Sequence, residues 1–167
     1  IEISNNKITP SYLTIVANAA KLNAMYIIFI RELRKKNSVD VVNNMNNMFT
    51  QANAFNQDIG NWNVSNVTSM RGLFVNASNF NQALENWDVS NVTNMNWMFY
   101  KAASFNQSLE GWELSFVEEM YGMFSDADSY NQNLSSWNVE NVTLCGAFNA
   151  NTTQWILPKP TFTNCTP

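Results

Sequence analysis

Side chains that could carry out acid–base or metal chemistry are scarce in this sequence. Histidine, the commonest general base and metal ligand, is absent from all 167 residues. Acidic residues gather between positions 110 and 119, in what will prove to be the fourth unit of a sequence repeat. They are Glu110, Glu113, Glu118 and Glu119. Their spacing does not match a calcium-binding loop, and catalytic carboxylates would need a cleft that shields one of them. We therefore expect no enzyme activity, no metal and no cofactor, and we take the four acids as a candidate surface for a partner.

The two cysteines, Cys145 and Cys165, both lie near the C-terminal end. Because they bracket the last repeat unit and the tail, we expect one disulfide in a secreted protein. Two free thiols in a cytosolic protein are the alternative. The sequence begins at Ile1 without a methionine or a signal peptide, which favours a mature or truncated product.

Tryptophan recurs once in each repeat unit and could bind ligands by stacking. The column consists of Trp62, Trp87, Trp112 and Trp137. A row of indole rings could stack on sugars, but an aromatic residue that recurs in every unit is also typical of core packing. We favour packing, and a carbohydrate-binding row remains the alternative.

These residues belong to a repeat of about 25 residues, and such a period is the signature of a stacked repeat array. The unit that starts at Phe80 starts again at Phe105. A second column contains asparagine, at Asn56, Asn81, Asn106 and Asn131. We expect these amides to turn inward and form a ladder that satisfies backbone groups of the neighbouring coils. The 29 asparagines supply polarity in a chain with only 13% charged residues.

The apolar spacing within a unit predicts two short elements per coil. The pattern Phe-Asn-Gln-x-Leu indicates a short strand, and residues 67–77 carry apolar side chains at spacings of three and four, which favours a short helix. Thr68, Thr93 and Thr143 stand where helix caps would be. The predicted fold class is α/β, a leucine-rich-repeat-like solenoid of about five coils with one parallel strand and one helix in each.

The first 36 residues differ from the repeat. Thr9 and Pro10 form a helix start, and the residues that follow favour a helix up to about Lys36. We expect this helix to cap the first coil. Residues 12–30 contain one charge, Lys21, so a helix that crosses a membrane or docks on a partner is the alternative. The predicted organisation is a capping region (1–36), a solenoid (37–150) and a C-terminal capping tail (151–167).

The repeat motif carries a family resemblance. The unit Trp87-Asp-Val-Ser-Asn-Val-Thr-Asn-Met95, followed by Met-Phe, Ala and Phe-Asn-Gln, resembles the bacterial surface protein repeat. That repeat is a relative of the BspA-like leucine-rich repeats and was first catalogued as a mycoplasma domain of unknown function. The resemblance covers residues 37–150, and the tail from Trp155 resembles the ends of such proteins from marine Bacteroidetes. Phe116 and Glu118 depart from the motif, in which Asn91 and Thr93 stand.

The resemblance implies an exported protein, secreted or held at the cell surface, that acts in adhesion or protein binding without catalytic residues. The formal net charge of −4 argues against a nucleic-acid partner. We therefore predict a non-enzymatic module that binds a protein or another cell-surface ligand. The alternatives are a structural subunit of a larger extracellular or virion assembly, which self-assembles through the helix of residues 12–33, and a carbohydrate-binding module. We do not expect association with a membrane.

Overall fold

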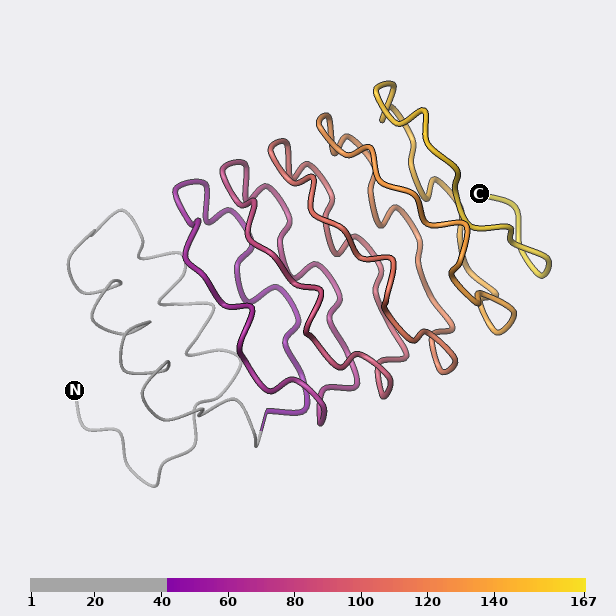
Figure 1. Ribbon diagram of the computed structural model, residues 1–167, viewed down its shortest axis with the longest axis horizontal. Helices are drawn as coiled ribbons and strands as arrows, with labels where there is room; N and C mark the ends of the chain where they lie inside the picture. The colour runs from indigo at the N-terminus through magenta and orange to yellow at the C-terminus, as the bar shows by residue number, and fades with distance from the viewer. Residues whose placement is uncertain (1–41) are drawn as a thin grey trace.

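The computed structural model describes residues 42–167 (Figure 1). The capping helix expected before residue 37, and the membrane or docking role considered for it, lie outside the described residues. In the described part, the backbone forms coils that lie side by side along the longest axis of the molecule (Figure 1). We number them coil 1 (42–66), coil 2 (67–91), coil 3 (92–116), coil 4 (117–141) and coil 5 (142–156), and the C-terminal tail (157–167) follows.

Isolated parallel bridges connect the five coils at one position in each. The bridge residues are Asn44, Ser69, Asn94, Glu119 and Leu144, and each pairs with the next in this order. Consecutive bridge residues are 25 positions apart, so the backbone repeats with the period of the sequence. No helix and no longer strand forms between residues 42 and 167. The predicted α/β solenoid with a strand and a helix in each coil is therefore wrong.

The segments expected to be helical are runs of tight turns instead. We call them the turn segments, at residues 46–51, 71–76, 96–101, 121–126 and 146–151. Their backbone amides alternate between two kinds of acceptor. The amides of Asn47 and Phe49 donate to Arg71 O and Leu73 O in coil 2, both at 2.9 Å, whereas the amide of Thr50 donates within coil 1 to Asn47 O at 3.1 Å. A helix would direct all of these amides along its own axis.

Left-handed backbone conformations explain why the chain does not continue as a helix. The second and sixth residues of each turn segment have positive φ, for example Gly72 at 64° and Asn76 at 55°. A single residue in this left-handed conformation is enough to end a right-handed helix. At Gly72 the absence of a side chain is also a steric requirement, because a Cβ atom there would lie 2.3 Å from Asn47 Oδ1. The apolar spacing of three and four is thus produced by successive turns.

The expected strand at the Phe-Asn-Gln positions is also absent, because asparagine side chains replace the backbone acceptors of a sheet. Asn56 Oδ1 accepts from Asn81 N and from Gln82 Nε2, both at 2.9 Å. The same pair of bonds recurs one coil further on, where Asn81 Oδ1 is the acceptor. The side chains are half-buried or exposed rather than inward-facing, and each reaches along the stack to the next coil.

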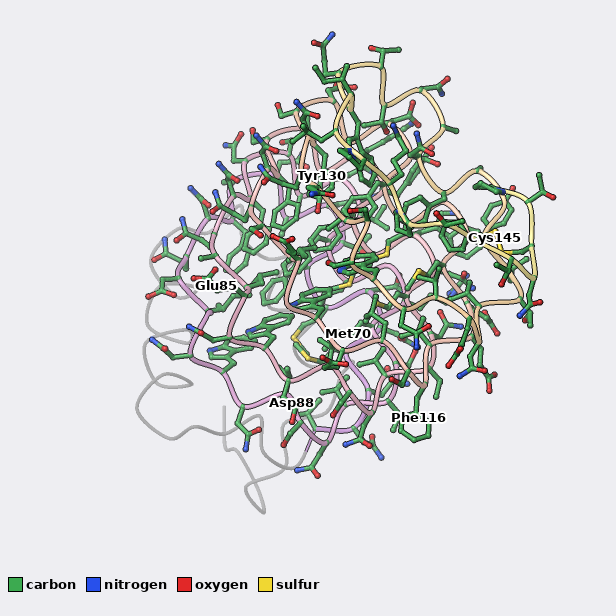
Figure 2. All side chains as sticks on the ribbon, turned by 45° about the vertical axis from the view of Figure 1, so that its right-hand side comes forward. Met70, Glu85, Asp88, Phe116, Tyr130 and Cys145 are labelled. Atoms are coloured by element: carbon green, nitrogen blue, oxygen red, sulfur yellow. A yellow bond between two sulfur atoms is a disulfide. The ribbon has the colours of Figure 1, made fainter. Side chains whose placement is uncertain are left out.

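The core consists of aromatic rings stacked from coil to coil. Phe74 and Phe99 have ring centroids 5.5 Å apart, and in the neighbouring column those of Phe80 and Phe105 are 5.8 Å apart. The two columns also touch, because Phe99 lies 4.1 Å from Phe105. Methionine, valine, leucine and tryptophan columns surround them and are buried. In Figure 2, Met70 and Tyr130 lie in the interior, whereas Phe116 lies at the outer edge.

Replacing Asn81 by alanine is expected to lower the free energy of unfolding by about 1–3 kcal/mol. The substitution leaves the Asn106 amide and the Gln107 side-chain amide without their acceptor. Asn81→Asp is the matched control, because it keeps the acceptor oxygen. It replaces the Nδ2 group, which donates no hydrogen bond within the described residues, by a second oxygen and a negative charge. Urea denaturation followed by tryptophan fluorescence measures both variants. An equal loss in both would contradict the acceptor role.

Tyr130→Phe is expected to stabilise the chain by about 1–2 kcal/mol. Tyr130 stands in the column of Phe55, Phe80 and Phe105, and its hydroxyl is buried without a hydrogen-bond partner in the described structure. The same burial raises the pKa of this hydroxyl far above its usual value. Thermal and urea unfolding test the prediction. A lower midpoint in the variant would mean that the hydroxyl has a partner in solution.

The end of the stack is covered by the last residues of coil 5 and by the tail. Trp155 lies edge-on against the Tyr130 ring, with centroids 4.8 Å apart, and Phe162 packs in the same way on Phe148 at 5.0 Å. Leu134 N donates to Pro158 O at 2.9 Å, which joins coil 4 to the tail. Cys145 and Cys165 form a disulfide between coil 5 and the tail. The last coil is therefore closed by side chains and by a covalent link.

Candidate functional site

The tryptophan column predicted from the sequence is part of the scaffold. Its four side chains are between 3% and 7% exposed. Three of the indole Nε1 atoms donate to the backbone of the preceding coil, as Trp87 does to Ile59 O at 3.0 Å. The fourth, Trp62 Nε1, has no partner in the described structure. Buried rings offer no face to a sugar, so this column cannot form a carbohydrate-stacking row.

The four acidic residues between positions 110 and 119 are spread over two coils. Glu110 and Glu113 are exposed on coil 3, and Glu118 is exposed on coil 4. Glu119 is half-buried and accepts hydrogen bonds from Asn94 Nδ2, at 2.6 Å, and from Asn96 Nδ2. Glu119 therefore joins coil 4 to coil 3. Among residues 42–167, no three Cys, Asp or Glu side chains lie close enough together to hold a metal ion.

Side chains that do not repeat from coil to coil meet on the outer face of the turn segments. Trp97 has a left-handed backbone, at a position that Asn47, Gly72, Gly122 and Ala147 occupy in the other coils. The Arg71 guanidinium carbon lies 4.8 Å from the centre of the Trp97 ring, a cation–π arrangement. On the side of coil 4, the Tyr121 ring meets Trp97 edge-on at 5.5 Å. Three successive coils thus contribute one side chain each to a cation–aromatic row.

A shallow open pocket of about 270 Å³ lies beside this row. Its lining residues come from coils 1, 2 and 3, and they are Asn47, Arg71, Gly72, Val75, Trp97 and Tyr100. The aromatic and valine side chains form its apolar walls. The pocket therefore combines one guanidinium group with apolar surface, which suits binding rather than acid–base chemistry.

A second cation stands next to the pocket. Lys101 Nζ lies 5.0 Å from the centre of the Tyr100 ring. The Tyr100 hydroxyl, which interacts with the ammonium group, and the Asp126 carboxylate raise the pKa of Lys101 above its ordinary value. Lys101 therefore carries its charge at every physiological pH.

The repeat pattern does not reveal this site, because the site is formed by residues that do not repeat. Arg71, Trp97 and Tyr100 belong to no column of like residues. One signal was present: of the six tryptophans, Trp97 stands in a column that otherwise holds small residues. A tryptophan at such a position cannot pack as its counterparts do, so it must lie on the outside.

A family model described as "Mycoplasma protein of unknown function, DUF285" matches residues 15–87 and again residues 43–156. Together the two matches span most of the chain. The chain belongs to the DUF285 family. The two DUF285 matches overlap between residues 43 and 87, as expected when a family pattern is itself repetitive and can be placed in more than one register. The first match begins at residue 15, well before residue 37, where the sequence analysis expected the repeat to start.

No curated protein and no solved structure matches this DUF285 chain. In the part of the chain that the structure describes, no helix is long and apolar enough to span a membrane.

Proposed function

We propose that this chain is a non-enzymatic protein-binding module of an exported or cell-surface protein. The observation that carries the proposal is the pocket of Arg71, Trp97 and Tyr100 on the outer face of coils 2 and 3. The repeated side chains are engaged in stacking and in hydrogen bonds between coils, so the residues that do not repeat are the ones left for recognition. Tryptophan, tyrosine and arginine are the residue types that dominate binding energy at protein interfaces.

Two further observations support an extracellular setting. The Cys145–Cys165 disulfide favours an oxidising compartment. The resemblance of the repeat to bacterial surface proteins and BspA-like leucine-rich repeats, which is finer than the DUF285 membership, agrees with secretion or surface attachment. Adhesion through this module is the role that fits both.

Protein rather than carbohydrate is favoured as the ligand because cations lie over the half-buried aromatic rings of the pocket. Arg71 stands over Trp97 and Lys101 over Tyr100, so neither ring offers that face to a sugar. The buried tryptophan column offers no alternative stacking surface.

A random peptide library displayed on phage and a glycan array, both probed with residues 1–167, test the proposal. We expect enrichment of peptides, and we expect Trp97→Ala to weaken their binding about tenfold or more. Phe116→Ala is the matched control, because it removes an exposed aromatic ring outside the pocket. Unfolding curves establish that both variants are folded. Absence of peptide enrichment, or equal binding by the two variants, would overturn the proposal.

A further inference from the structure

Arg71 has donors available for a ligand. Its side chain is exposed, and it makes no ion pair within residues 42–167. Its guanidinium group lies over the Trp97 ring. A guanidinium that rests on an aromatic ring keeps its N–H groups directed outward in its own plane, where they match the two oxygens of a carboxylate.

The charged side chains around the pocket are mostly basic, whereas those in the rest of the described chain are mostly acidic. Residues 42–167 contain only three basic side chains, Arg71, Lys101 and Lys159, against ten acidic ones. Two of the three stand at this pocket, on coils 2 and 3. Asp126 acts on Lys101 and offsets part of its charge, so Arg71 is the principal anchor. A positive site within an otherwise acidic part of a chain attracts a negative group, and the surrounding acids repel that group.

The other residues that line the pocket determine which chemical group a ligand must carry beside its negative group. Val75, Trp97 and Tyr100 give the pocket apolar walls, and its volume of about 270 Å³ accommodates one or two side chains. A small inorganic anion would leave these walls uncovered. A carboxylate attached to an apolar body would fill the pocket and pair with the guanidinium.

We propose that this pocket binds a carboxylate carried by a peptide next to an apolar side chain. Two sources supply that chemistry: the side chain of a glutamate or aspartate within the peptide, and the free carboxylate at its C-terminal end. This inference rests on the proposed protein-binding function and narrows the ligand to peptides that present a carboxylate beside an apolar side chain.

An array of tethered peptides tests the inference. Each peptide has Glu, Asp, Gln or Asn between apolar residues and ends in either a free carboxylate or an amide, and oligogalacturonate spots provide an acidic sugar. We expect residues 1–167 to bind a carboxylate-bearing peptide about tenfold or more tightly than its amide counterpart. Comparison of the peptides with an internal carboxylate and those with a free C-terminal carboxylate identifies which of the two groups the pocket binds. Binding should weaken as salt rises, because the charges are exposed.

Variants of two of the three cations make the test specific. Arg71→Gln is expected to remove the preference for the carboxylate, and Arg71→Lys to retain only part of it, because lysine cannot form the paired bonds. Lys159→Gln is the matched control: Lys159 Nζ lies 5.2 Å from the Trp155 ring, a similar cation–aromatic pair outside the pocket. Its removal should leave the preference unchanged.

The outcomes separate this inference from the proposed function. Peptide binding that depends on Trp97 but is equal for glutamate and glutamine peptides would overturn the acidic-ligand inference and leave protein binding standing. Tighter binding to oligogalacturonate than to any peptide would overturn both, and so would a lack of binding to every spot. A loss of preference in Lys159→Gln equal to that in Arg71→Gln would show general charge attraction and would also overturn the inference.

Discussion

Replacing Phe99 by alanine is expected to lower the free energy of unfolding by about 3–5 kcal/mol. Phe99 is fully buried in coil 3, and its ring stacks on Phe74 at 5.5 Å, on Phe105 at 4.1 Å and on Phe124 at 5.3 Å. Alanine removes all three contacts and leaves a cavity that a stacked column cannot close, because the coil spacing is fixed by hydrogen bonds on both sides.

The same chain provides a control of the same residue type. Phe116 is 63% exposed, also in coil 3, so Phe116→Ala should change stability by no more than about 0.5 kcal/mol. Urea denaturation of the two variants and the parent chain gives the comparison. Equal losses for Phe99→Ala and Phe116→Ala would contradict the assignment of Phe99 to the core.

Cys165→Ala is expected to destabilise the chain by about 3 kcal/mol. The disulfide closes a loop with a sequence separation of 20, and cross-links of this span stabilise mainly by restricting the unfolded chain. This substitution leaves Cys145, which is fully buried, as a small apolar side chain in the core. The contact of Phe162 with Phe148 depends on the same tail and should loosen with it.

A reducing agent supplies the control for the cysteine variant. Dithiothreitol should lower the unfolding midpoint of the parent chain to that of Cys165→Ala, and it should not change the midpoint of the variant further. A Cys165→Ala chain as stable as the oxidised parent would contradict a stabilising role for the disulfide.

The period of the backbone and its buried columns could be predicted from the sequence, because like residues in every unit occupy like environments. Phe80 and Phe105, for example, are both fully buried. The local conformation could not be predicted in the same way. Residues 67–77 have helical spacing, but left-handed residues interrupt each turn segment, and only Gly72 and Gly122 among them are glycines. Asparagine, tryptophan and alanine occupy the same position elsewhere, so no residue type marks the reversal.

The candidate site lay beyond sequence reasoning for a different physical reason. A column of like residues identifies what holds the coils together, whereas the pocket consists of residues from three coils, and most of these residues differ in type from their counterparts in the other coils. Arg71 and Trp97 are 26 positions apart in the sequence. They approach one another only because each coil of about 25 residues stacks on the one before it. Their proximity follows from the stacking distance and not from any local pattern.

The hydrogen bonds between coils restrict how the length of such a chain can change when its gene gains or loses repeat units. Each coil offers the next the same acceptors that it receives from the previous one: Asn56 Oδ1 for the Asn81 amide, Asn81 Oδ1 for the Asn106 amide and Asn106 Oδ1 for the Asn131 amide. A recombination event that inserts or deletes a whole unit of 25 residues therefore leaves the backbone amides of this asparagine column paired at the new junction. An event of any other length shifts the register and leaves donors unpaired. Gene duplication can thus lengthen this molecule in fixed steps, and each step places a new set of outward-facing residues beside the old ones.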